Sequence, residues 1–99
     1  MKIVPHESGG RQKFMVIDHD SYREYQALVA LIQQRFSAQV VKSVDGPDAS
    51  AIQLACARGS CFVIWDDVTG IAIGKGDSGD SAAAEEVAGF LAATEFPSV

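Results

Sequence analysis

Residues 50–75, SAIQLACARGSCFVIWDDVTGIAIGK, decide the fold that this sequence predicts. Apolar residues alternate with polar or small ones near its start, and the run CFVIW in its middle is the most apolar part of the chain. Short runs of this kind, separated by turns that contain glycine, are typical of β-strands joined by hairpins. Asp67 and Gly70 suit the first and fourth positions of a type I turn with a glycine bulge. We therefore predict three antiparallel strands, at 50–57, 61–66 and 70–75.

A helix and two more strands are predicted before this unit. Residues 13–18 (KFMVID) and 38–44 (AQVVKSV) have the composition of strands. Between them, Ser21 and Glu24 have the spacing of a capping box, which predicts a helix that runs to about Phe36. Its apolar residues recur every three or four positions, as expected for one buried face: Tyr22, Tyr25, Leu28, Val29, Ile32 and Phe36.

The last part of the chain predicts a loop over 76–81 (GDSGDS) and a second helix over 81–95. The predicted order is therefore β-α-β-β-β-β-α, with 1–11 as a candidate N-terminal strand or arm. We expect a single α+β domain over 1–99, with a mostly antiparallel sheet packed with two helices. The first crossover should be right-handed and leave its two strands parallel. The sequence leaves open whether the helices cover opposite faces of the sheet or leave one face uncovered.

Composition excludes several classes of protein. Of the 99 residues, 47% are hydrophobic and 21% are charged, which is not the composition of a disordered chain. No apolar run approaches the length of a membrane helix, and the N-terminus lacks the features of a signal peptide, so we predict a cytoplasmic protein and no membrane partner. The net charge is −5 and the basic residues are scattered, which argues against nucleic acid as a partner.

Acidic residues follow three of the predicted strands. Strands 13–18, 38–44 and 61–66 should run in the same direction, so their C-terminal ends should meet at one edge of the sheet. We call the residues that follow them the acidic rim: Asp18, His19, Asp20, Asp45, Asp48, Asp66 and Asp67. Carboxylates beside a histidine can bind a divalent cation or act in acid–base catalysis. However, the spacing matches no metal loop, and each acid also suits a helix cap, a turn or a strand end. We therefore predict that the acidic rim is a docking surface for a basic protein partner. We assign no catalytic or metal-binding residue and no cofactor.

The two cysteines have two interpretations. A two-residue loop at Arg58-Gly59 would place Cys56 opposite Cys61, where a strained disulfide is geometrically feasible. Two reduced, buried thiols are the interpretation that we favour in a reducing compartment. Three short matches, to a serine-protease motif, a phosphate loop and a dinucleotide fingerprint, lack the context that each requires.

The apolar strand at 61–66 also predicts a surface. Phe62 and Ile64 should point away from the face that carries Cys61, Val63 and Trp65, and an uncovered Phe62 and Ile64 would form a candidate interface. The function predicted from these features is protein–protein interaction, as an accessory, regulatory or inhibitor-like module, with homodimerisation as one candidate mode. The alternative is a protein that binds a small ligand or a divalent metal at the acidic rim. The absence of a nucleophile–base pair leads us away from an enzyme.

Overall fold

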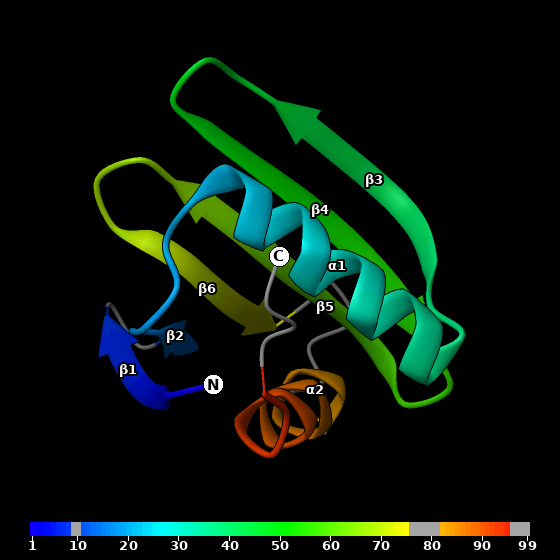
Figure 1. Ribbon diagram of the computed structural model, residues 1–99. Coiled ribbons are helices and arrows are strands. Elements are labelled where there is room, and N and C mark those ends of the chain that lie inside the picture. Colours follow the sequence, from blue (N-terminus) through cyan, green and yellow to red (C-terminus); the bar gives the residue numbers. More distant parts are fainter. Residues whose placement is uncertain (9–10, 76–81, 96–99) are drawn as a thin grey trace.

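The computed structural model describes residues 1–8, 11–75 and 82–95, which form one sheet and two helices (Figure 1). The predicted loop and helix cap over 76–81 lie outside the described residues. The chain begins with a strand, so the order is β-β-α-β-β-β-β-α. The strands are β1 (Ile3–Ser8), β2 (Arg11–Val16), β3 (Gln39–Asp45), β4 (Ala49–Cys56), β5 (Gly59–Asp66) and β6 (Gly70–Lys75). The helices are α1 (Tyr22–Phe36) and α2 (Ala82–Ala92). The predicted α+β class with two helices is confirmed.

All neighbouring strands of the six-stranded sheet are antiparallel, in the order β1-β2-β6-β5-β4-β3. Strands β3 to β6 form a meander of consecutive hairpins, which leaves one edge of β6 free. Strand β2 pairs with that edge, and β1 extends the sheet by one more hairpin. As predicted, β2 and β3 run in the same direction. They are not neighbours, however, because α1 carries the chain across the sheet to its far edge.

Helix α1 has the predicted start and end, and its central apolar residues are buried. At the two ends of the predicted face the burial is smaller, since Tyr22 is 39% exposed and Phe36 is half-buried. The Ser21 hydroxyl accepts a hydrogen bond from the Glu24 amide, and the Glu24 side chain accepts one from the Ser21 amide, which together form the capping box. The helix ends at Phe36, where Ser37 takes a left-handed conformation with φ 51° and the Ala38 amide donates to the Gln33 carbonyl.

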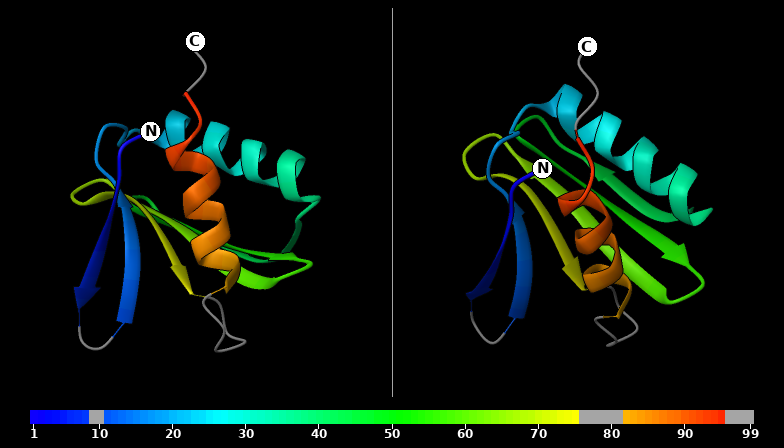
Figure 2. Two further views of the ribbon diagram at one scale, coloured as in Figure 1. Left: turned by 90° about the horizontal axis from the view of Figure 1, so that it is seen from below. Right: turned by 60° about the horizontal axis from the view of Figure 1, so that its bottom comes forward.

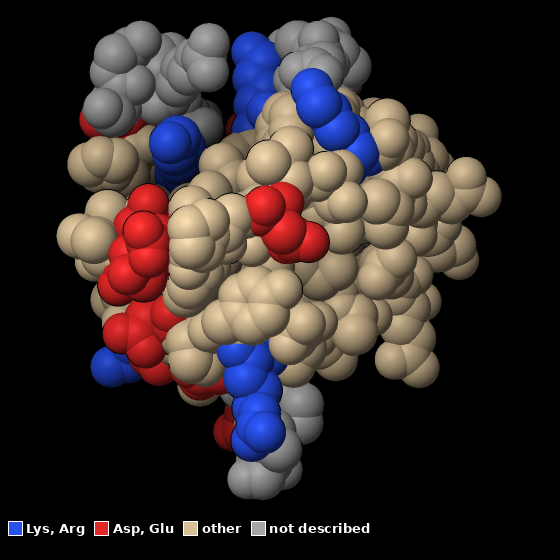
Figure 3. Space-filling view, turned by 90° about the horizontal axis from the view of Figure 1, so that it is seen from above, with Lys and Arg blue, Asp and Glu red and all other residues tan. Residues whose placement is uncertain are grey.

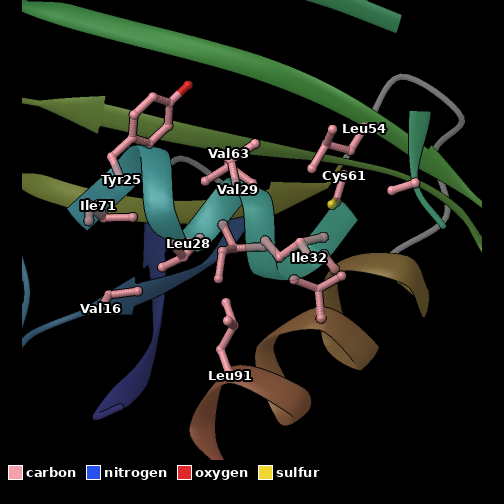
Figure 4. Close-up of a cluster of buried hydrophobic side chains, with 14 of the residues drawn as sticks. Val16, Tyr25, Leu28, Val29, Ile32, Leu54, Cys61, Val63, Ile71 and Leu91 are labelled. Carbon is pink, nitrogen blue, oxygen red and sulfur yellow. The ribbon is translucent and has the colours of Figure 1, made fainter. Parts of the chain in front are cut away.

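Both helices lie on the same face of the sheet, as the two views of Figure 2 show. The core therefore forms between the helices and this face, which we call the covered face. Figure 4 shows part of it, with Leu28 and Ile32 of α1 facing Val63 of β5 and Leu91 of α2. All four side chains are fully buried. No described helix covers the other face, which decides the question that the sequence left open.

The β4–β5 hairpin differs from the prediction by one residue. Its turn consists of Ala57 and Arg58, and Gly59 pairs with Cys56 while Cys61 pairs with Leu54. Gly59 has φ 119°, so the glycine is needed at the first strand position after the turn rather than inside it. The predicted Cys56–Cys61 pairing is thus wrong, and both thiols are free. Burial, and then the charge of Cys56, raises the pKa of Cys61 to about 11.

The β5–β6 turn ends at the predicted glycine, Gly70. Gly70 pairs with Asp66 and has φ 87°, a left-handed conformation that other residues adopt only with strain.

Candidate functional site

The acidic rim lies along the side of the sheet where β2, β3 and β5 have their C-terminal ends. Figure 3 shows acidic side chains gathered on the side of the molecule where Figure 1 places the β3–β4 and β5–β6 turns. Two hydrogen bonds connect the segments that form this edge. The Asp67 amide donates to the Asp48 carbonyl at 3.0 Å, and the Trp65 indole Nε1 donates to the Asp20 carbonyl at 2.9 Å. The structure thus brings Asp20 near the end of β5, and Asp48 beside Asp67.

Several acids of the rim have a structural role within the chain. The Asp18 carboxylate accepts a hydrogen bond from the Lys2 amide at 3.0 Å. The Asp66 carboxylate accepts from the Val68 amide at 2.8 Å and stabilises the turn that follows β5. Asp45 lies near the start of α1: burial, and then the charge of Asp45 and that of Tyr22, raises the pKa of Tyr25 to about 12.

The geometry of the rim lends no support to a metal site. Within residues 1–8, 11–75 and 82–95, no three His, Cys, Asp or Glu side chains lie close enough together to hold a metal ion. The prediction that the rim binds a basic partner stays a prediction.

Glu24 has a contact with the acidic rim that the sequence did not indicate, because the sequence assigned it only to the capping box. Its carboxylate is hydrogen-bonded to His19 Nδ1 and also accepts from the Asp20 and Ser21 amides. Partial burial acts to raise the pKa of Glu24, but the hydrogen bonds from His19 and Ser21, with the positive charge of His19, outweigh it and lower the pKa to about 2. The Nε2 atom of His19 is 3.7 Å from the Asp18 carboxylate. His19 therefore connects two carboxylates at the start of α1.

Replacing Glu24 with glutamine should make the protein less sensitive to acid. The ordinary pKa of 4.5 falls to about 2 on folding, so ionised Glu24 stabilises the fold above pH 4.5 and that stabilisation disappears as the pH falls toward 2. With allowance for solvent screening, we expect Glu24→Gln to lower the free energy of unfolding at pH 7 by about 1 kcal/mol. It should also flatten the dependence of stability on pH in this window. Urea denaturation at a series of pH values measures both effects.

Glu85→Gln is the matched control, because Glu85 is an exposed carboxylate in the first turn of α2. It should leave the acid-dependent part of the stability unchanged. An unaltered pH profile in Glu24→Gln would contradict the assigned role of the Glu24 carboxylate.

The uncovered face of the sheet carries a continuous line of apolar side chains. Successive strand pairings place one residue from each strand directly opposite the next, and residues opposite each other point to the same face. In sheet order, this apolar row consists of Val4, Met15, Ala72, Ile64, Ala51 and Val44. Its two ends are the most open, since Val4 is 40% exposed and Val44 is 58% exposed.

The adjacent row on this face has an apolar centre and basic ends. It consists of His6, Lys13, Gly74, Phe62, Gln53 and Lys42. Gln53 is buried, and its amide donates to the Ser60 hydroxyl at 3.2 Å, so this polar group is already hydrogen-bonded within the chain. The basic residues lie on the outer strands, and the centre around Phe62 and Ile64 carries no charge.

The sequence located the centre of this surface but not its extent. Alternation along β5 was enough to place Phe62 and Ile64 on one face. Val4, Met15 and Val44 join them only through the strand order, for which no local pattern gives a signal.

Comparison with known protein families, with curated proteins and with solved structures finds no match for this chain. Among the residues that the structure describes, neither helix has the length and apolar character needed to cross a membrane.

Proposed function

We propose that this protein is a protein-interaction module whose binding surface is the uncovered face of its sheet. The apolar row is the observation that carries the proposal. It runs across all six strands on the face that no described helix covers. Only Val4 and Val44 at the two ends of the row are exposed, while Ala72 in its middle is 7% exposed. Apolar surface that is left uncovered is unfavourable in water, and a continuous row of it on a folded domain commonly marks an interface.

The chemistry of the surface supports a protein partner rather than a small ligand. Interface centres are apolar and depleted in charge, with polar groups at the border, and this face has the same arrangement. Phe62 and Ile64 lie at its centre, while Lys13 and Lys42 lie on strands nearer its edges. The acidic rim borders this surface at one end, where Asp66 shares the face. Charge of that kind contributes more to orientation and to the rate of association than to affinity.

Site-specific photocrosslinking in intact cells tests the proposal. A photoreactive phenylalanine analogue replaces Val44, which is exposed at one end of the apolar row. Matched probes replace Gln26, which is exposed on α1, and Asp67 in the acidic rim. We expect covalent adducts with the probe at 44 and none with the probe at 26.

The control positions make the result decisive. Adducts at 67 without adducts at 44 would overturn the sheet-face proposal and favour the acidic rim. Equal adducts at 44 and 26 would indicate unspecific collisions and would also contradict it.

A further inference from the structure

At the centre of the uncovered face, a strand with two large side chains pairs with a strand that carries small residues, and we call these two strands the ridge and the groove. Strand β5 presents the large side chains of Phe62 and Ile64, whereas its neighbour β6 presents Gly74 and Ala72. The pairing is direct, with Phe62 opposite Gly74 and Ile64 opposite Ala72. The ridge and the groove therefore have the same length, run along the strands and lie side by side.

From this pairing of large with small side chains we infer that the surface binds a second copy of the same chain. This inference rests on the proposed function and specifies the partner. The two copies would be related by a two-fold axis that lies between their sheets, parallel to the strands and midway between β5 and β6. Rotation about this axis would place the β5 ridge of one copy against the β6 groove of the other. The same contact then forms twice, which is the self-complementarity that a closed dimer requires. The product is a sandwich of two sheets about 10 Å apart, with the helices outside.

The next strands continue the same complementarity. The axis places β2 of one copy over β4 of the other, so that the long side chain of Met15 lies over the small side chain of Ala51. In the neighbouring row, Lys13 lies over Gln53 rather than over another charge. His6 and Lys42 would face each other from the outermost strands, where the twist of the sheets increases their separation.

Gly74 supplies an independent observation. A glycine inside a strand is destabilising relative to alanine, so its presence needs a reason. The chain itself supplies none, because Gly74 does not have positive φ and a Cβ atom built on it would meet no atom within 4 Å. Glycine in a strand often marks a place where another chain or a ligand approaches closely. Here the ridge residue Phe62 of a second copy would occupy the open space above Gly74.

The plane of this face is close in size to a specific interface, and within it Ala72 and Gln53 are already buried by their neighbours. The described chain has extents of 31 × 29 × 24 Å. A third row on this face consists of Ala49, Asp66 and Gly70. Six strands about 4.8 Å apart and three rows of side chains give a plane on the order of 600 Å² per copy. Side-chain relief adds to this figure, and specific interfaces bury about 800 Å² per partner.

Sedimentation equilibrium over a concentration series, with paired size-exchange variants, tests the inference. The wild-type protein should dimerise. Ala72→Ile should fill the groove and weaken the dimer at least tenfold. Because Ala72 is 7% exposed, the larger side chain should also lower the stability of the monomer without unfolding it. Ile64→Ala combined with Ala72→Ile exchanges ridge and groove and should restore dimerisation. Thermal unfolding of each variant confirms that the monomer is intact.

Two results would overturn the dimer. One is a wild-type monomer up to about 1 mM, a concentration at which even weak specific contacts are populated. The other is a dimer that Ala72→Ile leaves unchanged, which would place the contact elsewhere, such as the edge strand β3. If the photoreactive probe at Val44 captures a different protein, the proposed function still holds even though the dimer is excluded. An adduct of twice the chain mass supports the dimer.

Discussion

Leu28→Ala is expected to lower the free energy of unfolding by about 3 to 4 kcal/mol. Leu28 is fully buried at the centre of α1, where its side chain faces the sheet and α2 (Figure 4). Truncation removes transfer free energy and leaves a cavity, because side chains from both helices and from the sheet surround the site and relax only partly. A small domain has a total stability of about 5 to 15 kcal/mol, so this change removes a large share of it. Urea denaturation followed by circular dichroism measures the loss.

Val68→Ala is the control for this truncation. Val68 lies in the β5–β6 turn and is 85% exposed, so removing its methyl groups should change stability by no more than about 0.5 kcal/mol. Similar small effects for both variants would mean that α1 does not pack on the sheet as the structure shows.

Gly70→Ala should destabilise the protein by about 2 kcal/mol. Gly70 has φ 87°, and a residue with a Cβ atom pays about 1 to 2 kcal/mol in this conformation. The new Cβ would also lie 3.3 Å from the Cβ of Asp20, closer than an ordinary contact. Movement of Asp20 would disturb its carbonyl, which accepts the hydrogen bond from the Trp65 indole. Because Trp65 is the single tryptophan, its fluorescence should shift together with the loss of stability.

Gly89→Ala is the control for Gly70→Ala, because it makes the same replacement at a glycine that does not have positive φ. Gly89 is exposed within α2, and an added Cβ would meet nothing within 4 Å. Alanine is the better helix former, so this variant should gain up to about 1 kcal/mol and leave the Trp65 signal unchanged. A Gly70→Ala protein that is as stable as the wild type would contradict the left-handed conformation at this turn.

The exposed edge strand β3 is relevant to the proposed dimer, because a sheet edge offers a second place for self-association. All seven residues of β3 are exposed, and Val41 is 60% exposed. Unpaired edges of this kind invite further strands, and natural sheets protect them with charges and bulges. Strand β3 has both, since Lys42 lies at its centre and the pairing with β4 shifts between Val40 and Lys42. These features favour a closed contact through the face over open-ended growth through the edge.

Much of the fold could be predicted because its signals are local. The capping box of Ser21 and Glu24, with apolar residues at helical spacing, predicted the start of α1 and its end at about Phe36. Alternation along 50–75 determined three strands and which side chains share a face. The direction of β2, β3 and β5 followed from counting turns, and it placed the acidic rim at one edge. The capping box, the helical spacing and the strand alternation depend on residues within a few positions of one another in the chain, where backbone geometry alone fixes the spacing.

What the tertiary structure decided depends on contacts between distant segments. The sequence did not show that both helices cover one face, since an apolar β5 is compatible with a helix on either side. The hairpin register was wrong by one residue, because Gly59 was placed inside the turn although its positive φ is needed just after it. The apolar row exists only once β2 pairs with β6. The sequence by itself determined the elements and their inner and outer faces, whereas the neighbours of each strand, and so the uncovered surface, were decided by how the apolar faces are buried together.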